Sequence, residues 1–350
     1  MSSRYAHFTE DDYRPRANKK GSRPRTKDRP SFEDSREGMV VQVDRGRYRV
    51  VMGEELGSAV AGDLPIVTCV RASALRRRAI VPGDRVLVVG DTSGAEGTLA
   101  RIVGIVPRAT VLRRSADDTD PTERVIVANA DQLVVVTATA DPEPSWGLID
   151  RALTAAFDAG VTPLLAVTKL DIAGIDAITE RFEGTGVEIV PCGFDATGAP
   201  RVAPLEARLT GAMSVLLGHS GVGKSTLMNA LVPHADRATG AVNDVTGRGR
   251  HTSSSAICLP LPDGGWVIDT PGVRSFGLAH VAVENVVSAF EDLVPATADC
   301  PKGCTHLADS PGCALDAWVV AGRAGDAGPA RLASLRRLLG NLAAADPHAQ

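Results

Sequence analysis

A glycine-rich segment in the second half of the chain has the residues that phosphate chemistry needs. It runs as Gly-His-Ser-Gly-Val-Gly-Lys-Ser between an apolar strand pattern at 215–217 and a helical pattern. Glycines let backbone N–H groups turn toward phosphate oxygens at the start of a helix. We expect Lys224 to reach the β- and γ-phosphates of a nucleotide and to act in catalysis, and Ser225 to hold Mg²⁺. The nucleotide-binding residues expected in this loop are Gly218, His219, Ser220, Gly221, Val222, Gly223, Lys224, Ser225 and Thr226.

A second candidate for Mg²⁺ binding lies 45 residues beyond Lys224, where Asp269 follows the strand pattern Trp266–Ile268. The sequence there is Asp-Thr-Pro-Gly. As an isolated tetrapeptide it would fit an ordinary turn after a strand, but its distance from the phosphate loop fits the second metal-binding strand of a P-loop protein. We expect Asp269 to bind Mg²⁺ through water and the amide of Gly272 to contact the γ-phosphate.

Base recognition is expected from Thr168, Lys169 and Asp171, which follow the strand pattern Pro163–Val167. The pattern Asn/Thr-Lys-x-Asp is typical of GTPases, where the aspartate accepts hydrogen bonds from the N1–H and N2–H groups of guanine. Adenine lacks this pair of donors, and a buried site that is left unpaired rejects the wrong base. Asp171 therefore favours GTP over ATP. The alternatives are a chance Lys-x-Asp at a strand end and a P-loop ATPase.

The order of these motifs along the chain is rotated. The base motif Thr168–Asp171 begins 50 residues before the phosphate loop at Gly218, whereas ordinary GTPases have the reverse order. A nucleotide site depends on spatial neighbours, so the same sheet can form after a circular permutation of the chain. The permutation also places the switch segment Asp269–Gly272 directly before the C-terminal part.

Near the C-terminus, three thiols and one imidazole lie within fourteen residues. They offer the four ligands of a tetrahedral Zn²⁺ site with no open position, so the metal would be structural. The alternative is a group of free thiols. We interpret the scattered Cys69, Cys192 and Cys258 as buried thiols. The candidate zinc ligands are Cys300, Cys304, His306 and Cys313.

The elements that position these residues are apolar strands that alternate with helical patterns from Val125 onward. Such alternation predicts an α/β P-loop architecture, a mostly parallel sheet with helices on both faces. Two later helical patterns, Ala314–Val320 and Pro329–Ala344, predict a small α-helical domain around the cysteine cluster. The expected strands are Gln132–Ala138, Pro163–Val167, Val187–Val190, Met213–Leu217 and Trp266–Ile268, with a helix at Gly147–Ala159.

Earlier in the chain, short strand patterns separated by turn residues predict a small closed β-barrel, an OB-fold. The expected strands are Met39–Val43, Arg47–Met52, Arg78–Val81, Arg85–Val89 and Thr98–Val106. This region is rich in arginine, which either lines solvated strand edges or forms a face that binds RNA phosphates. The arginines are Arg45, Arg47, Arg49, Arg71, Arg76, Arg77, Arg78, Arg85 and Arg101.

We divide the chain into four parts: a disordered basic arm at 1–37, an OB-fold RNA-binding domain at 38–110, a circularly permuted GTPase domain at 111–290 and a zinc-binding helical domain at 291–350. The 350 residues, 44% of them hydrophobic, can form several cores, and the formal net charge of −4 does not decide whether the partner is a nucleic acid. The sequence has no hydrophobic leader and no run of about 18 apolar residues, which favours a cytoplasmic location.

Together these motifs resemble the ribosome small-subunit-dependent GTPase A family (RsgA/YjeQ) over roughly residues 38–340. Further matches are Ala128–Gln132, the Gly-Arg-Gly-Arg-His-Thr stretch Gly247–Thr252, and Pro271–Gly277. The resemblance implies a cytoplasmic factor that binds the 30S ribosomal subunit and its 16S rRNA late in maturation, and that hydrolyses GTP to GDP when the subunit stimulates it. We expect a monomer. The alternative is an RNA-binding protein whose nucleotide pocket is not catalytic.

Many GTPases orient the attacking water with a glutamine after the Asp-x-x-Gly motif, but here that position is Val273, which has no hydrogen-bonding side chain. The resemblance implies His251 in this role, since an imidazole can accept a proton near neutral pH. Thr252 is the candidate switch threonine that closes on Mg²⁺ and the γ-phosphate. The alternative is that His251 contacts rRNA together with Arg248 and Arg250.

Some positions differ from the family pattern, among them the segment after the strand Val187–Val190, Thr168, and Ser253-Ser254 where further threonines are usual. Pro191-Cys192-Gly193 stands where a Ser-Ala pair contacts the guanine oxygen through its backbone. Thr168 stands where asparagine is commoner, which removes a carboxamide that supports the base and the phosphate loop.

Overall fold

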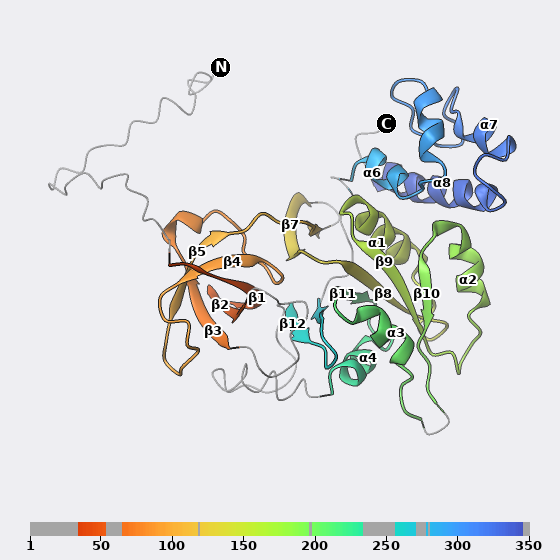
Figure 1. Ribbon diagram of the computed structural model, residues 1–350. Coiled ribbons are helices and arrows are strands. Elements are labelled where there is room, and N and C mark those ends of the chain that lie inside the picture. Colours follow the sequence, from red (N-terminus) through yellow and green to blue (C-terminus); the bar gives the residue numbers. More distant parts are fainter. Residues whose placement is uncertain are drawn as a thin grey trace, which may run out of the picture. The chain divides into compact units, whose positions relative to one another are not determined.

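The computed structural model, shown in Figure 1, describes residues 34–53, 65–117, 120–195, 198–233, 256–270, 278 and 281–345. Residues 1–33 of the basic arm predicted at 1–37 lie outside these described residues. Eleven strands pair into one sheet, in the order β10-β9-β8-β11-β13-β12-β1-β2-β3-β5-β4. The sheet has two parts, because its last five strands close into a barrel.

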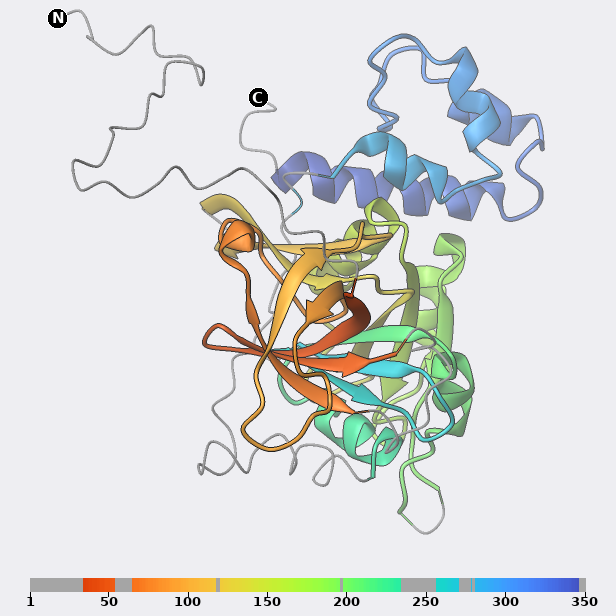
Figure 2. The same ribbon diagram turned by 60° about the vertical axis from the view of Figure 1, so that its left-hand side comes forward.

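The barrel forms because β1 pairs with β4 as well as with β2. Alternate strand residues such as Val40, Val67 and Ile102 fill its interior. The wrapped strands are visible in Figure 2. This OB-like barrel confirms the predicted fold of the N-terminal part. Its strands are β1 (Arg36–Asp44), β2 (Arg47–Met52), β3 (Ile66–Arg71), β4 (Arg85–Val89) and β5 (Ala100–Ile105).

One barrel strand lies elsewhere than predicted. The third strand is β3. The prediction of a strand at Arg78–Val81 is wrong, because these residues form a turn and a loop after the short 3-10 helix η2 (Ser73–Leu75). The apolar pair Ile80 and Val81 is buried without strand pairing. The Val81 N–H donates a hydrogen bond to the Asp84 carboxylate (2.8 Å), which holds this loop on the barrel.

The second part of the sheet is parallel, and its strands are nearly continuous apolar runs, as expected when both faces are covered. Only β12 runs antiparallel, beside β13. The five strands predicted here are confirmed, with bounds within one residue; β12 is an additional strand. The strands are β8 (Gln132–Ala138), β9 (Thr162–Thr168), β10 (Glu188–Pro191), β11 (Met213–Gly218), β12 (Ile257–Pro260) and β13 (Trp266–Asp269).

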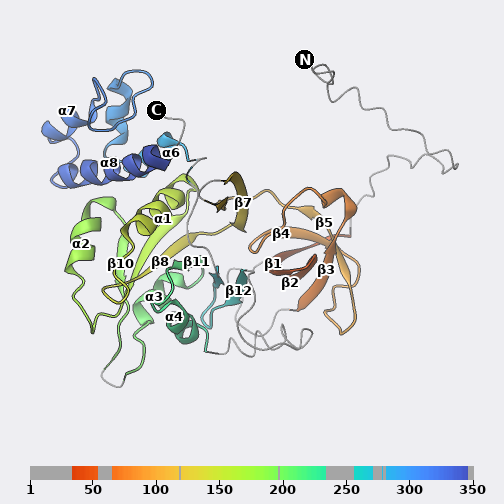
Figure 3. The same cartoon turned by 180° about the vertical axis from the view of Figure 1, so that it is seen from behind.

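Helices cover both faces of the parallel sheet, as predicted (Figure 3). Leu133 and Val135 of β8 share a core with α1 and α2. Val134 and Val136 point the other way and share a second core with α3 and α4. The helices are α1 (Trp146–Asp158), α2 (Asp176–Phe182), α3 (Ala203–Leu209) and α4 (Lys224–Leu231), and the 3-10 helix η3 (Glu183–Thr185) follows α2.

Two connections join the barrel to the parallel part. The hairpin of β6 (Val111–Asp117) and β7 (Asp120–Ala128) leads from one to the other and was not predicted. In addition, β1 pairs with β12 through Gln42 and Ile257.

The C-terminal part consists of short helices and one long helix, and the helices predicted at Ala314–Val320 and Pro329–Ala344 are confirmed. None of the helices in the described ranges combines the length and apolar character that a membrane span requires. The elements are α6 (Val283–Ser288), the 3-10 helix η4 (Val294–Asp299), α7 (Leu315–Val320) and α8 (Gly328–Ala345).

A buried carboxylate attaches α8 to the parallel-sheet part. Asp150 of α1, with a side chain only 2% exposed, accepts a hydrogen bond from Arg181 of α2 (3.0 Å). Two groups of α8 approach the same carboxylate, Asn341 Nδ2 at 3.3 Å and Arg337 Nε at 3.4 Å. A buried charge needs such partners, so this carboxylate holds α1, α2 and α8 together.

The turn at Gly83 fixes the junction between barrel and parallel sheet. Asn129 Nδ2 donates to the Gly83 carbonyl (2.8 Å), and the Ala128 N–H donates to the Pro82 carbonyl (3.1 Å). Beside them, the guanidinium of Arg108 donates to the buried carboxylate of Asp84 at 2.7 and 2.9 Å. The turn therefore lies directly against the backbone that leads into β8.

We predict that Gly83→Ala strongly destabilises the protein. Gly83 has φ +85°, and a Cβ there would lie 2.0 Å from the Ala128 carbonyl oxygen. Strain and clash together should lower the free energy of unfolding by about 3 kcal/mol or more. Gly46→Ala is the matched control, because Gly46 has φ +83° with nothing within 4 Å. The control should lower the free energy of unfolding by only about 1 kcal/mol. Equal losses in urea unfolding would contradict this packing.

Candidate nucleotide-binding and metal sites

The carboxyl ends of parallel strands bring the predicted nucleotide-binding motifs to one edge of the sheet. Thr168 ends β9, Gly218 ends β11 and Asp269 ends β13. Gly218 is level with Val136 of β8, and Asp269 is level with Leu216 of β11. Ligand sites in parallel α/β sheets form at this edge. The rotated order of the motifs along the chain therefore does not prevent a shared site.

The predicted phosphate loop connects β11 to α4, which begins at Lys224. Gly223 precedes the helix with φ +91°, a conformation that glycine adopts without strain. The loop residues His219 and Ser220 are exposed, as are Ser225 and Thr226 in the first turn of α4. The helix start is thus open to a phosphate group.

Lys224 and Asp269 face each other across this edge. The Lys224 ammonium donates a hydrogen bond to a carboxylate oxygen of Asp269. The adjacent Thr270 hydroxyl donates to the Leu216 carbonyl (2.9 Å), which fixes the end of β13 against β11. The cation expected at the phosphates and the carboxylate expected at Mg²⁺ therefore lie in one place, as a P-loop site requires.

Thr168 ties the base motif to the phosphate loop. Its buried hydroxyl lies 2.6 Å from the Val222 carbonyl and 3.2 Å from the Thr137 carbonyl, and its one proton is best placed for Val222. From the sequence, threonine in place of asparagine removes a group that supports this loop. The carboxamide is absent, but the shorter threonine side chain contacts the loop backbone through its hydroxyl.

Lys169 is held in a backbone conformation that is uncommon for a residue with a side chain, with φ +57°. Its carbonyl accepts a hydrogen bond from the Thr139 hydroxyl (2.6 Å), and its ammonium donates to the Asp141 carbonyl. The sequence does not reveal Thr139 and Asp141 as supports, because these contacts join residues about 30 positions apart. Asp171, the expected guanine ligand, is exposed at the start of the following loop.

The segment after β10 lies beside the base motif. The Cys192 N–H donates to the Val167 carbonyl (2.6 Å), and a Cβ at Gly193 would lie 3.4 Å from Leu170 Cδ1. Burial raises the pKa of the Cys192 thiol to about 11. The Cys-Gly pair that replaces Ser-Ala therefore stays next to the residues expected to bind guanine.

The residues predicted to act on the attacking water and the γ-phosphate, His251, Thr252 and Gly272, lie outside the described residues. The same holds for Arg248, Arg250 and Val273. Their roles stay predictions.

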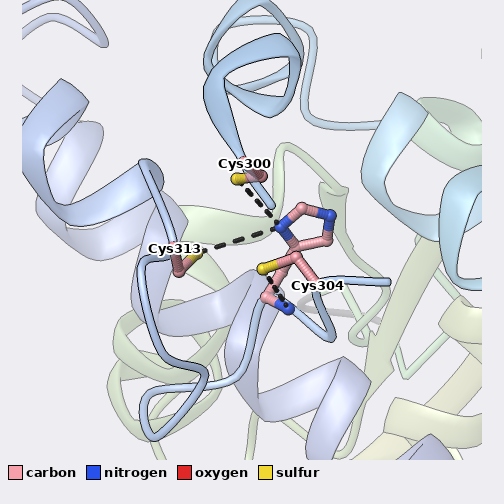
Figure 4. Close-up of side chains that lie close together, drawn as sticks. Cys300, Cys304 and Cys313 are labelled. Atoms are coloured by element: carbon pink, nitrogen blue, oxygen red, sulfur yellow. Dashed lines mark hydrogen bonds between the residues drawn. The ribbon is translucent and has the colours of Figure 1, made fainter. Parts of the chain in front are cut away.

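The four predicted metal ligands converge in the C-terminal part, where Figure 4 labels the three cysteines. The thiol sulfurs of Cys300, Cys304 and Cys313 and a ring nitrogen of His306 all lie within 4.8 Å of one another. His306 Nδ1 is 3.6 Å from Cys300 Sγ and 3.9 Å from Cys313 Sγ. This arrangement is a ligand set that could hold a metal ion.

The protonation chemistry of these groups suits a cation. Burial lowers the pKa of His306, which favours the neutral imidazole that binds metals. Burial opposes ionisation of Cys304, but hydrogen bonds with the Ser310 hydroxyl and the His306 N–H lower its pKa overall. Burial raises the pKa of Cys313 to about 11, and a bound cation would offset this cost by stabilising the thiolate.

The other three cysteines are buried free thiols, as predicted. Burial raises the pKa of Cys69 to about 12 and also raises the pKa of Cys258. Thiols that stay protonated are poor nucleophiles and poor metal ligands, so these residues serve as core packing.

Known proteins are similar in sequence to this chain. The model of the RsgA GTPase family matches residues 105–279, a range that includes the base motif, the phosphate loop and Asp269 but ends before the cysteine cluster. A protein of Azotobacter vinelandii named Small ribosomal subunit biogenesis GTPase RsgA is 37% identical over 271 residues, which are 75% of this chain and 75% of that protein.

Solved structures share the fold. YjeQ from Thermotoga maritima has a TM-score of 0.61 at 25% identity, over 88% of this chain and 98% of its own. YloQ, described as a circularly permuted GTPase, has a TM-score of 0.61 at 22% identity, over 91% and 99%. Sequence and fold lead to the same conclusion: the chain belongs to the RsgA family of GTPases.

Proposed function

We propose that this protein is a GTPase that acts late in the assembly of the small (30S) ribosomal subunit and hydrolyses GTP to GDP and phosphate when the subunit stimulates it. The observation that carries the proposal is the hydrogen bond from Thr168 to Val222, beside the Lys224–Asp269 ion pair. These contacts unite base motif, phosphate loop and metal-binding aspartate. The name of the Azotobacter vinelandii relative supports the role in small-subunit biogenesis.

In this proposal Asp171 selects guanine, with Thr168 and Lys169 holding the base loop in place. The loop Gly218–Thr226 binds the phosphates through its backbone N–H groups and Lys224. Mg²⁺ would be held by Ser225, Asp269 and Thr252, and it would supply positive charge that stabilises the phosphates. The amide of Gly272 contacts the γ-phosphate and His251 orients the attacking water.

We propose Zn²⁺ as the metal of Cys300, Cys304, His306 and Cys313. Three thiolates and one imidazole fill a tetrahedral zinc site without an open position, so the ion is structural. It stabilises the loop between η4 and α7, two elements of only six residues each.

We propose the OB-like barrel as the part that contacts 16S rRNA. Its exposed arginines supply the positive charge that phosphate binding needs, and they lie at positions 45, 47, 71, 76, 77, 78 and 101. We further propose a cytoplasmic monomer divided into the basic arm 1–37, the barrel 38–110, the GTPase domain 111–290 and the zinc domain 291–350.

We predict slow hydrolysis by the free protein and a steep rise in turnover when purified 30S subunits are added. Val273 has no group that orients water, and His251 follows Arg248 and Arg250 in the sequence, which rRNA phosphates would hold in place. His251→Ala should reduce the stimulated turnover by about 100-fold and leave GTP affinity and 30S binding nearly unchanged, because the imidazole acts on water.

Phosphate release measured with and without subunits, at rising salt, checks this prediction. Salt should weaken the stimulation because phosphate contacts are salt-dependent. Turnover that 30S subunits do not change would contradict the proposed function and favour a non-catalytic pocket. Full stimulated turnover in the His251 variant would exclude only the role of His251.

Asp171→Asn should weaken GTP binding by about 100-fold and improve binding of xanthosine triphosphate, because an amide can donate to the xanthine carbonyl whereas a carboxylate only accepts. Competition between the two nucleotides measures the effect. Asp176→Asn is the matched control, because this carboxylate lies nearby in the first turn of α2. The base preference of this control variant should not change. If Asp171→Asn also keeps its base preference, Asp171 is not the guanine ligand.

Cys304→Ser should release zinc, unfold the ligand loop and weaken 30S binding more than GTP binding, because the metal cluster lies outside the nucleotide motifs. Zinc content, circular dichroism and the two affinities are measured on the same preparations. Cys69→Ala removes a thiol from the barrel core and should keep its zinc. An equal loss of 30S and GTP binding in Cys304→Ser would show that the two parts do not fold separately.

A further inference from the structure

Two of the three sulfurs of the metal cluster, those of Cys300 and Cys304, have polar groups close to them. The Ala314 N–H donates to Cys300 Sγ (3.3 Å). The His306 N–H donates to Cys304 Sγ (3.4 Å), and the Ser310 hydroxyl lies 3.2 Å from the same sulfur. Such groups orient metal ligands and spread the negative charge of thiolates.

A further polar contact to the ligand loop comes from the long helix α8. Arg336 donates from Nε to the carbonyl of His306 (3.3 Å). Its two terminal nitrogens donate to the carboxylate of Asp316, at 2.8 and 2.6 Å. Asp316 raises the pKa of Arg336, and the neighbouring Cys313 sulfur adds to this effect. The guanidinium thus lies between α7 and two of the ligand residues.

The position of Arg336 matters because the zinc cluster would carry a net negative charge. Zn²⁺ with three thiolates and a neutral imidazole carries a net charge of −1, and a guanidinium is always positive. The Arg336 side chain is 18% exposed, whereas that of Asp316 is 56% exposed, so water screens the carboxylate more than the arginine. The arginine therefore contributes a positive charge that the exposed carboxylate offsets only in part.

We propose that Arg336 is a positioning residue of the metal site, which holds the His306 backbone and balances the thiolate charge, and which thereby increases the affinity for zinc. This inference rests on the proposed zinc site. It assigns to α8 a role in metal binding, although none of the four ligands lies on that helix.

A second arginine of α8 provides a matched control. Arg331 Nε donates to Asp292 Oδ1 (2.7 Å), its side chain is 20% exposed and its guanidinium stacks over Phe290. Arg331→Gln therefore removes a comparable ion pair from the same helix. Asp316→Asn is the second control, because it breaks the ion pair of Arg336 but leaves the guanidinium beside the cluster.

The experiment measures zinc affinity of the full chain by competition with a chromogenic chelator. Arg336→Gln should bind zinc roughly 10- to 100-fold more weakly than the wild type. Arg331→Gln and Asp316→Asn should stay within about threefold of the wild type, since both keep the guanidinium at the cluster. Arg336→Lys should fall between, because lysine keeps the charge but lacks the fork that binds carbonyl and carboxylate together.

Cobalt(II) absorption separates weaker binding from a lost site. At saturating Co²⁺, Arg336→Gln should show the thiolate charge-transfer bands of the wild type, which means that the four ligands still assemble. If Arg336→Gln does not fold, Arg336→Lys decides: weakened zinc binding supports the proposal, and wild-type affinity overturns it.

Two results would overturn the role of Arg336 while leaving the zinc site in place. One is wild-type zinc affinity in Arg336→Gln. The other is a loss of zinc affinity in Asp316→Asn as large as that in Arg336→Gln, which would mean that only the ion pair between α7 and α8 matters. A wild-type chain that does not bind zinc would instead overturn the proposed zinc site, and the inference with it.

Discussion

The proposed nucleotide site depends on the parallel register of β8, β9, β11 and β13. Because their carboxyl ends meet at one edge, the Thr168 hydroxyl reaches the Val222 carbonyl although the two residues are 54 positions apart. Chain order enters only through the connections between strands, so the base motif can precede the phosphate loop without moving these atoms. The permutation changes which element comes next: in the described part of the chain, the element that follows β13 is the C-terminal helix α6.

One buried carboxylate contributes to the attachment of the C-terminal helices, beside a shared apolar core. Asp150 is shared by Arg181 of α2, the helix that follows the base motif, and by Arg337 of α8. Burial lowers the pKa of Arg337, and the charge of Asp150 works against this effect, so the arginine depends on the carboxylate to stay charged at low cost. Removing one partner of a buried pair costs about 3–5 kcal/mol, far more than an exposed pair contributes.

The parts of the fold that could be predicted from the sequence are those with local signals. The phosphate loop, Asp269 and the buried runs of β8 and β11 carry their signal within a few residues. By contrast, β12 has four residues and becomes a strand through its neighbours β13 and β1, and Ile80 and Val81 are buried without being a strand. The hydrogen bond between Thr168 and the phosphate loop could not be predicted from the sequence either. The two residues are far apart in the chain, and only the folded sheet brings the hydroxyl and the carbonyl together.

The metal-ligand loop has little regular structure of its own, and His306 within it has φ +57°. Its position must therefore come from what it contacts. Successive residues of one helix point about 100° apart, so adjacent side chains of α8 can face different neighbours. Arg336 donates to the His306 carbonyl, and Arg337 lies against Asp150 of the GTPase part. A single turn of α8 thus contacts both the ligand loop and the parallel sheet's helices, and a shift of that turn would have to move the two contacts together.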